Sequence, residues 1–414
     1  MEVGEIPLRQ LTPADFFDDE GTPTKTTVEQ QRVEESVLRK LKDFEDFSDL
    51  EPGIHLKRDD HLPYLLKGLE RLSEGYECLD ASQPWLCYWI VHSLSLLGHE
   101  LSEQQKSSVV KFLEKCQSPT GGYGGGPEQF AHLAPTYAAV NCLCIIATDD
   151  AYESINREKL LYFLFQMRQN DGSFTMHEGG ESDTRSLYCA ISVASLTGLD
   201  EIAGESLFAG SPQYIVSCQT YEGGIGGCPG AEAHGGYTFC GYAGLVILGH
   251  EKLIDTDRML RWLVNKQMRL EGGFQGRTNK LVDGCYSFWQ GGVFPLIQNT
   301  LLAEGCKSLC KHNWLFNQQA LQEYLLISCQ SRFGGLIDKP GKSPDYYHTC
   351  YCLSGLTIAQ HPPDLSNLII GEHANNLVPT HPAYNIEWEY VTKANEYFTK
   401  RPLKLSDEMQ KTKK

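Results

Sequence analysis

The chain has 414 residues, 41% of them hydrophobic and 21% charged, which supplies enough apolar material for a large core. Its formal net charge of −17 disfavours nucleic acid or an anionic membrane as the main partner, because both repel an acidic protein. No stretch is long and apolar enough to span a bilayer, and the acidic N-terminus lacks the basic start and apolar block of a signal peptide.

The two ends of the chain are expected to lie outside the main domain. A helix is predicted to begin at Thr26, because Thr26 and Glu29 form a capping-box pattern ahead of a helical run at 28–41. The predicted divisions are a disordered N-terminus (1–25), a helix and linker (26–60), one large domain (61–390) and a charged C-terminal tail (391–414).

A motif recurs through the middle of the chain. Each copy has a glutamine, a short polar spacer, one or two glycines and then usually an aromatic or aliphatic residue. The glutamines are Gln117, Gln169, Gln219, Gln267 and Gln330, at spacings of 52, 50, 48 and 63 residues. A period near fifty is typical of stacked supersecondary units.

Each motif stands between two helical segments of different character. The preceding segment is amphipathic, as at 106–116, 159–167 and 259–268, whereas the following one is apolar and rich in small residues. Helices that are apolar on most sides are buried, and one-sided helices cover them. The buried helices are predicted at 85–97, 136–147, 184–197, 236–248, 284–297 and 346–359. Six such pairs predict an all-α fold, an α/α barrel, in which the glycines allow a left-handed turn after each outer helix.

Three residues with metal-binding side chains lie at the starts of neighbouring inner helices: Asp283, Cys285 and His348. Their spacing is not a metal signature by itself, because Asp283 and Cys285 would face opposite sides of a helix. The simpler interpretation is an exposed aspartate, a small core cysteine and a hydrogen-bonded histidine. However, if all inner helices enter the barrel from one end, their first residues gather around one mouth. A carboxylate, a thiolate and an imidazole there would supply three zinc ligands and leave a fourth position open.

The same mouth is predicted to attract anions. Arg277 and Lys280 precede one inner helix, and His234 precedes another. Helix N-termini also favour negative charge. A metal site and an anion pocket are therefore expected to adjoin each other.

The fifteen cysteines are scattered through apolar segments and form no Cys-x-x-Cys pair. Such residues are mostly small buried hydrophobes, and neither a ribbon-type zinc site nor a redox pair is indicated. Reduced thiols predict a cytoplasmic location.

Five segments give the chain a specific likeness to a known family. They are GGFQGR (272–277), NKLVDGCYSFWQ (279–290), GGIGG (223–227), EAHGGYTFC (232–240) and DKPGKS (338–343). The chain resembles the protein prenyltransferase β-subunit family, and within it the farnesyltransferase type, from about residue 60 to residue 390.

The resemblance implies an enzyme whose barrel is the catalytic domain. Such an enzyme transfers a farnesyl group from farnesyl diphosphate to the cysteine of a C-terminal CaaX sequence in a protein substrate. It implies one Zn²⁺ held by Asp283, Cys285 and His348, with the substrate cysteine in the open position. It also implies Mg²⁺ with the diphosphate, and an obligate heterodimer with an α subunit that contributes a further lysine.

The resemblance also assigns roles to individual residues. The diphosphate pocket would comprise His234, Arg277, Lys280 and Tyr286, of which Lys280 and Tyr286 join the three metal-site residues as catalytic. The farnesyl chain would lie among Trp85, Trp89, Tyr188, Tyr237, Trp289 and Tyr351, with Arg185 and Cys240 nearby. The peptide would contact Ser82, Trp85, Trp89, His132, Ala134, Pro135 and Tyr347.

Two positions favour farnesyl over the longer geranylgeranyl group. Trp85 is bulky where geranylgeranyl-transferring relatives have a smaller residue, which shortens the cavity. Asp338 resembles the residue that holds Mg²⁺ in farnesyltransferases, whereas the type I geranylgeranyl relatives have a lysine there. A geranylgeranyltransferase type I β subunit is the closest alternative.

Two further classes share barrels of this kind. An isoprenoid cyclase would need an Asp-x-Asp-Asp or Asp-Asp-x-x-Asp motif in the barrel, and the sequence has neither there. A non-catalytic toroid of the thioester class needs a glutamine three residues after its cysteine, but Cys285 is followed at that distance by Phe288.

Overall fold

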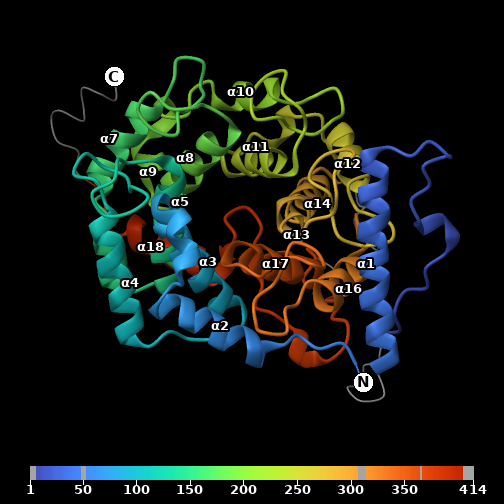
Figure 1. The fold of residues 1–414 in the computed structure, drawn as a ribbon. Coiled ribbons are helices and arrows are strands. Elements are labelled where there is room, and N and C mark those ends of the chain that lie inside the picture. Colours follow the sequence, from blue (N-terminus) through green and yellow to red (C-terminus); the bar gives the residue numbers. More distant parts are fainter. Residues whose placement is uncertain (1–5, 48–52, 306–313, 364–365, 404–414) are drawn as a thin grey trace.

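The computed structural model describes residues 6–47, 53–305, 314–363 and 366–403. Its helices form two concentric rings, as the α/α-barrel prediction requires (Figure 1). The inner ring consists of α3 (Gln83–Leu96), α5 (Leu133–Ile146), α8 (Thr184–Leu196), α11 (Gly235–Ile247), α13 (Tyr286–Trp289) with α14 (Val293–Ala303), and α17 (Tyr346–Gln360). Neighbouring inner helices pack on one another around the ring, and α17 closes it by packing on α3.

The outer ring covers these helices with one-sided amphipathic segments. It consists of α2 (Arg58–Glu70), α4 (Glu103–Cys116), α7 (Arg157–Met167), α10 (Ser211–Ser217), α12 (Thr256–Val264) and α16 (Gln318–Glu323) with a π-helical turn (Tyr324–Ser328). Shorter elements are α6 (Asp149–Glu153), α9 (Leu199–Ala203) and 3₁₀ turns at Pro13–Asp15, Glu74–Ser82, Gly204–Ser206, Glu251–Leu253 and His373–Asn375. In the described part of the chain, no helix is both long and apolar enough to cross a membrane.

The repeated glycines bring each turn close to the next outer helix. Gly121 has φ +103°, and a Cβ there would lie 1.9 Å from the backbone oxygen of Lys159 in α7. Gly223 has φ +111°, and a Cβ there would lie 2.1 Å from the backbone oxygen of Arg258 in α12. A side chain at either position would clash with backbone, so glycine is required where two repeats meet.

The inner helix predicted at 284–297 is broken in two. Tyr286–Trp289 forms α13, and the chain turns through Gly291 before α14 begins at Val293. A Cβ on Gly291 would lie 1.9 Å from the backbone oxygen of Ser287. The turn is therefore too tight for a continuous helix of ordinary residues. The outer helix predicted at 259–268 is also displaced, because α12 covers Thr256–Val264.

The N-terminal region differs from its prediction. Helix α1 (Lys25–Phe47) begins near Thr24 and Thr27, whose backbone nitrogens each bond the other's side-chain oxygen, rather than at Thr26. Residues 1–25 were predicted to be disordered, but in the described part Arg9 forms an ion pair with Glu323 at 2.9 Å. This ion pair fixes the segment on the barrel, outside which α1 also packs (Figure 1).

The C-terminal region closes one end of the barrel. A hairpin of β1 (Thr380–His381) and β2 (Ile386–Glu387) leads into α18 (Trp388–Thr399), which packs on α5 and α8. The tail predicted at 391–414 is thus helical and partly buried up to residue 399, while 404–414 lie outside the described residues. The backbone oxygens of Ala383 and Asn385 accept hydrogen bonds from Tyr188 and Tyr88, each at 2.7 Å.

Candidate active site

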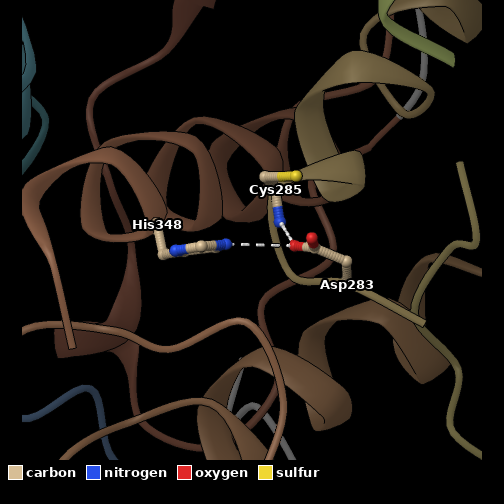
Figure 2. A group of neighbouring side chains, drawn as sticks. All are labelled: Asp283, Cys285 and His348. Carbon is tan, nitrogen blue, oxygen red and sulfur yellow. Dashed lines mark hydrogen bonds and ion pairs between the residues drawn. The ribbon is translucent and has the colours of Figure 1, made fainter. Parts of the chain in front are cut away.

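The first residues of the inner helices gather at the end of the barrel opposite the hairpin. Asp283 and Cys285 directly precede α13, and His348 lies in the first turn of α17, next to α13 in the ring. Figure 2 shows the three side chains together. One ligand atom from each lies within 4.8 Å of the other two. Among the described residues this is the one such group of potential metal ligands.

Hydrogen bonds orient the three ligands. Asp283 Oδ1 accepts from the backbone nitrogen of Cys285 at 2.8 Å and faces His348 Nε2 at 3.3 Å. Asp345, the N-cap of α17, accepts from the His348 backbone nitrogen at 2.7 Å and bonds Nδ1 of the same ring at 2.6 Å. Because Nδ1 is occupied, Nε2 is the nitrogen that can bind a metal. The sequence prediction missed Asp345, although an Asp-x-x-His pattern at a helix start was its signal.

The electrostatics of this group favour a cation. Burial opposes a charge on His348, but its bonds to Asp283 and Asp345 outweigh burial and raise the pKa of the ring to about 10. Burial, together with Asp283, raises the pKa of the Cys285 thiol well above its ordinary value. Zinc binds nitrogen, oxygen and sulfur at about 2.0–2.3 Å, so three donors within 4.8 Å need only small shifts to reach one ion. The donor set therefore fits Zn²⁺ with a fourth position for a substrate.

A mostly apolar cavity of about 320 Å³ adjoins the metal group. Tyr286 and Tyr347, the chain neighbours of Cys285 and His348, both line it. Trp289 donates to the Tyr347 hydroxyl at 3.0 Å and lies 4.4 Å from the ring of Tyr351. The remaining lining residues are Trp85, Trp89, Ala134, Tyr137, Met176, Arg185, Tyr188, Cys189, His234, Gly236 and Cys240. The cavity thus has the aromatic walls predicted for an isoprenoid chain.

A second hollow of about 460 Å³ lies beside the cavity and is more polar. Arg185 and His234 line both spaces, and Tyr237, Glu232 and Arg277 line the second. His234 caps α11 and its Nε2 lies 3.0 Å from the Tyr286 hydroxyl. Burial, assisted by Arg277, lowers the pKa of His234 to about 4, so the ring is neutral at physiological pH.

Two of the cations in this region have acidic partners. Arg277 Nη1 lies 2.8 Å from Glu232, and Arg185 Nη2 lies 2.6 Å from Asp183. The sequence prediction missed Glu232 as the partner of Arg277. An anion that enters the second hollow must therefore compete with Glu232 for this guanidinium.

Asp338 lies close to the metal group. Its backbone oxygen accepts hydrogen bonds from the Gly284 nitrogen and the Tyr324 hydroxyl, each at 2.8 Å. Burial and the nearby Asp283 carboxylate raise the pKa of Asp338. Its carboxylate is paired with Lys339, whose Nζ lies 2.5 Å from both oxygens.

Apart from the metal group and Asp338, four predicted site residues line neither space. Lys280 is exposed on the loop after Arg277, and its backbone nitrogen bonds the Gln275 side chain at 3.2 Å. Ser82 is half-buried ahead of α3, and Pro135 is buried within α5. His132 caps α5 through a hydrogen bond from Ala134 at 3.1 Å and adjoins the ring of His177.

Comparisons with known proteins agree with this architecture. The family model described as the prenyltransferase alpha-alpha toroid domain matches residues 56–386. The chain is 41% identical to protein farnesyltransferase subunit beta of Arabidopsis thaliana, over 86% of each protein. It is 40% identical to the protein of the same name from Schizosaccharomyces pombe, over 82% of this chain and 89% of that one.

A solved structure confirms the fold. That structure is of Candida albicans protein geranylgeranyltransferase-I complexed with GGPP. The match has a TM-score of 0.69 and covers 83% of this chain and 99% of that chain. Its sequence identity is 22%, so it supports the arrangement of the helices alone.

Proposed function

Since this chain belongs to the prenyltransferase alpha-alpha toroid family, and within it to the protein farnesyltransferase β subunits, we propose how its own residues carry out farnesyl transfer. In the reaction, the sulfur of a substrate cysteine forms a bond to the first carbon of the farnesyl group. The bond from that carbon to the diphosphate oxygen breaks, and the diphosphate leaves with the electron pair. The protein must therefore supply a reactive thiolate, an isoprenoid pocket and stabilisation for the departing anion.

Asp283, Cys285 and His348 would hold a Zn²⁺ ion, as their convergence within 4.8 Å supports. Bound there, Zn²⁺ lowers the pKa of a coordinated thiol, so that the substrate cysteine is available as a thiolate at neutral pH. Asp345 fixes the ring of His348 and keeps Nε2 directed at the site. The peptide would lie against Tyr347 and Ala134, which line the neighbouring cavity, and would reach the predicted contacts Ser82, His132 and Pro135 outside that lining.

The second hollow would receive the diphosphate. Negative charge grows on the leaving group in the transition state, so donors fixed in advance accelerate its departure. His234, Tyr286, Arg277 and Arg185 would serve this role, and their positions in the linings of the cavity and the second hollow support the proposal. Lys280 would join them from its exposed loop, and Asp338 would hold Mg²⁺ against the diphosphate oxygens.

The proposal also covers the partner subunit, the cellular compartment and the choice of prenyl donor. The active enzyme would be a heterodimer with an α subunit, and it would act in the cytoplasm. The farnesyl chain would occupy the aromatic cavity, with Trp85 in the wall limiting its length. Geranylgeranyl transfer is the alternative, and matched assays with both diphosphates on one CaaX peptide would separate the two.

The metal triad carries the proposal, and the variant Cys285→Ala tests it. Zinc content and peptide farnesylation should be measured for the chain coexpressed with an α subunit. The variant should lose most of its bound zinc and its turnover, whereas Cys142→Ala, a buried cysteine of α5, should retain both. Full zinc content and normal turnover in Cys285→Ala would contradict the metal assignment.

A further inference from the structure

We propose that Lys266 is a positioning residue that holds the loop carrying Arg277 and Lys280 in place for the diphosphate. This inference rests on the proposed function and deepens it. The loop comprises residues 276–281 and is named the diphosphate loop below; the bridge between Gln275 and Val282 closes its base. Lys266 lies outside the linings of both the cavity and the second hollow.

Lys266 reaches the diphosphate loop from within the barrel wall. It follows α12, is only 4% exposed, and its Nζ donates to Thr278 Oγ1 at 2.6 Å. Its backbone oxygen accepts from the Gln275 nitrogen at 2.9 Å. The backbone and the side chain of this residue therefore contact both the base and the middle of the loop.

The hydroxyl of Thr278 takes part in two hydrogen bonds, one as acceptor and one as donor. It accepts from Lys266 and donates towards Glu222 Oε1 at 3.4 Å. A threonine hydroxyl has one proton to donate, so this contact and that with Lys266 define its orientation. Thr278 is itself exposed, and its chain neighbour Arg277 faces the second hollow.

A buried lysine is costly unless its charge has partners. Burial lowers the pKa of Lys266, while Glu222 and Glu232 act in the opposite direction. Nζ also lies 5.2 Å from the centre of the Trp262 ring. An uncharged side chain of similar length would avoid this cost of burying a charge. The charge is thus better explained by the loop that it holds than by the stability of the barrel.

Other contacts hold the start of the diphosphate loop and the side chain of Arg277. The backbone oxygen of Gly276 accepts from the Gly235 nitrogen at 2.9 Å, which fixes the start of the loop against α11. Arg277 is held by Glu232, and Asn279 turns the chain with φ +62°. Without the Lys266–Thr278 contact, the middle of the loop would lose the support that sets the positions of Arg277 and Lys280.

The test compares two ligands that share the farnesyl chain, only one of which carries the diphosphate. Farnesyl diphosphate and farnesol should be titrated into the chain copurified with its α subunit, by tryptophan fluorescence. Lys266→Met and Thr278→Val should each raise the Kd for farnesyl diphosphate about tenfold and change the Kd for farnesol less than twofold. The double variant should bind farnesyl diphosphate no more weakly than Lys266→Met alone, because both changes remove the same contact. Lys266→Arg should restore most of the affinity.

Several outcomes would overturn the inference. Equal losses for both ligands would show general damage to the barrel, and unchanged binding of farnesyl diphosphate would show that the contact has no role. If Lys266→Met fails to fold, Thr278→Val decides, since Thr278 is exposed. Failure of the unaltered protein to bind farnesyl diphosphate would remove the proposed function itself, which is a different result from normal binding that the variants leave intact.

Discussion

The side chain of Gln330 accepts a hydrogen bond from the backbone nitrogen of Lys57 at 2.8 Å, so the last repeat is joined to the first. The same amide donates to the backbone oxygen of His55 at 2.8 Å. Three other motif glutamines bond the residue ahead of the next outer helix in the same way. These pairs are Gln117 with Asn156 (3.1 Å), Gln219 with Asp255 (3.1 Å) and Gln267 with Asn317 (2.9 Å). The repeated glutamine is therefore an amide clamp between neighbouring repeats.

Gln330→Ala should destabilise the barrel more than the same change at Gln169. Gln330 bonds backbone groups ahead of α2 and also His61, which is buried, whereas the Gln169 side chain donates to the backbone oxygen of Met167 in its own repeat. Loss of several partly buried partners is expected to cost about 2–3 kcal/mol for Gln330 and about 1 kcal/mol or less for Gln169. Urea unfolding of the two variants checks this, and equal midpoints would contradict the clamp.

The rings of helices could be predicted because their patterns are strong. The inner helix predicted at 346–359 is observed at Tyr346–Gln360, since a segment that is apolar on all sides has one place in such a fold. The turn at Gly291 could not be predicted, because it depends on a close approach to Ser287 that no periodicity reports. The helical C-terminal region had a readable signal in its apolar residues Val391, Ala394 and Phe398, which the charged residues around them obscured.

Only part of the candidate site could be predicted from the sequence. The convergence of Asp283, Cys285 and His348 followed from the barrel, because every inner helix begins at the same end. Glu232 was missed because only the fold brings its partner Arg277 near, whereas Asp345 had a local signal in its spacing of three residues from His348. The exposed position of Lys280 could not be read from the sequence either, because it depends on the path of the diphosphate loop.

Glu271 should make the docking of α1 dependent on pH. This carboxyl is 1% exposed, accepts from Gln30 of α1 at 2.8 Å, and has Oε2 buried without a partner among the described residues. Burial raises its pKa from 4.5 to about 7, although Gln30 and Arg9 oppose the rise and Glu34 adds to it. The folded state thus holds a proton that the unfolded state has released, so stability falls as pH rises from about 4.5 to 7.

Glu271→Gln should remove this pH dependence. The free energy of unfolding of the variant, relative to that of the unaltered protein, should be about 2 kcal/mol higher at pH 8 than at pH 5. Urea unfolding at the two pH values measures this difference. Glu396→Gln, an exposed position on α18, is the control and should change little at either pH. A gain that is equal at both values would show that Glu271 is not the titrating group.

Gly291→Ala should damage both stability and turnover. The added Cβ would meet the backbone oxygen of Ser287 at 1.9 Å, which can be relieved only by moving the end of α13. The cost is expected to be about 3 kcal/mol or more, and the displacement of Tyr286 and Trp289 should reduce turnover at least tenfold. Gly244→Ala in α11 meets only the side-chain tips of Ile191 at 3.2 Å and Ile215 at 3.6 Å, and should cost about 1 kcal/mol or less.

Trp85→Ala should change the preferred length of the prenyl group. Trp85 lines the cavity and lies 5.6 Å from the ring of Trp89 and 5.5 Å from that of Tyr137. Loss of the indole opens space for a further isoprene unit, and pocket contacts of this size are worth about 1–3 kcal/mol each. The ratio of kcat/KM for geranylgeranyl over farnesyl diphosphate should rise at least tenfold. Trp388→Ala, 50% exposed on α18, should leave the ratio unchanged.

Lys339 should compete with Mg²⁺ for Asp338. Its Nζ lies 2.5 Å from both carboxylate oxygens, and the two side chains are 12% and 16% exposed, so the pair is shielded from solvent. A cation that binds Asp338 must first displace this ammonium group. Lys339→Met is therefore expected to lower the Mg²⁺ concentration for half-maximal turnover about three- to tenfold, because a competing ion pair in a shielded place is removed.

The matched variants separate this competition from a direct role for Lys339. Asp338→Ala should abolish the response to Mg²⁺, and Lys342→Met, an exposed lysine of the same loop, should leave it unchanged. If Lys339 instead binds the diphosphate itself, Lys339→Met would raise KM for farnesyl diphosphate and leave the half-maximal Mg²⁺ concentration as it was. Steady-state turnover across a Mg²⁺ titration at two farnesyl diphosphate concentrations distinguishes the two, because competition for Asp338 moves only the Mg²⁺ midpoint.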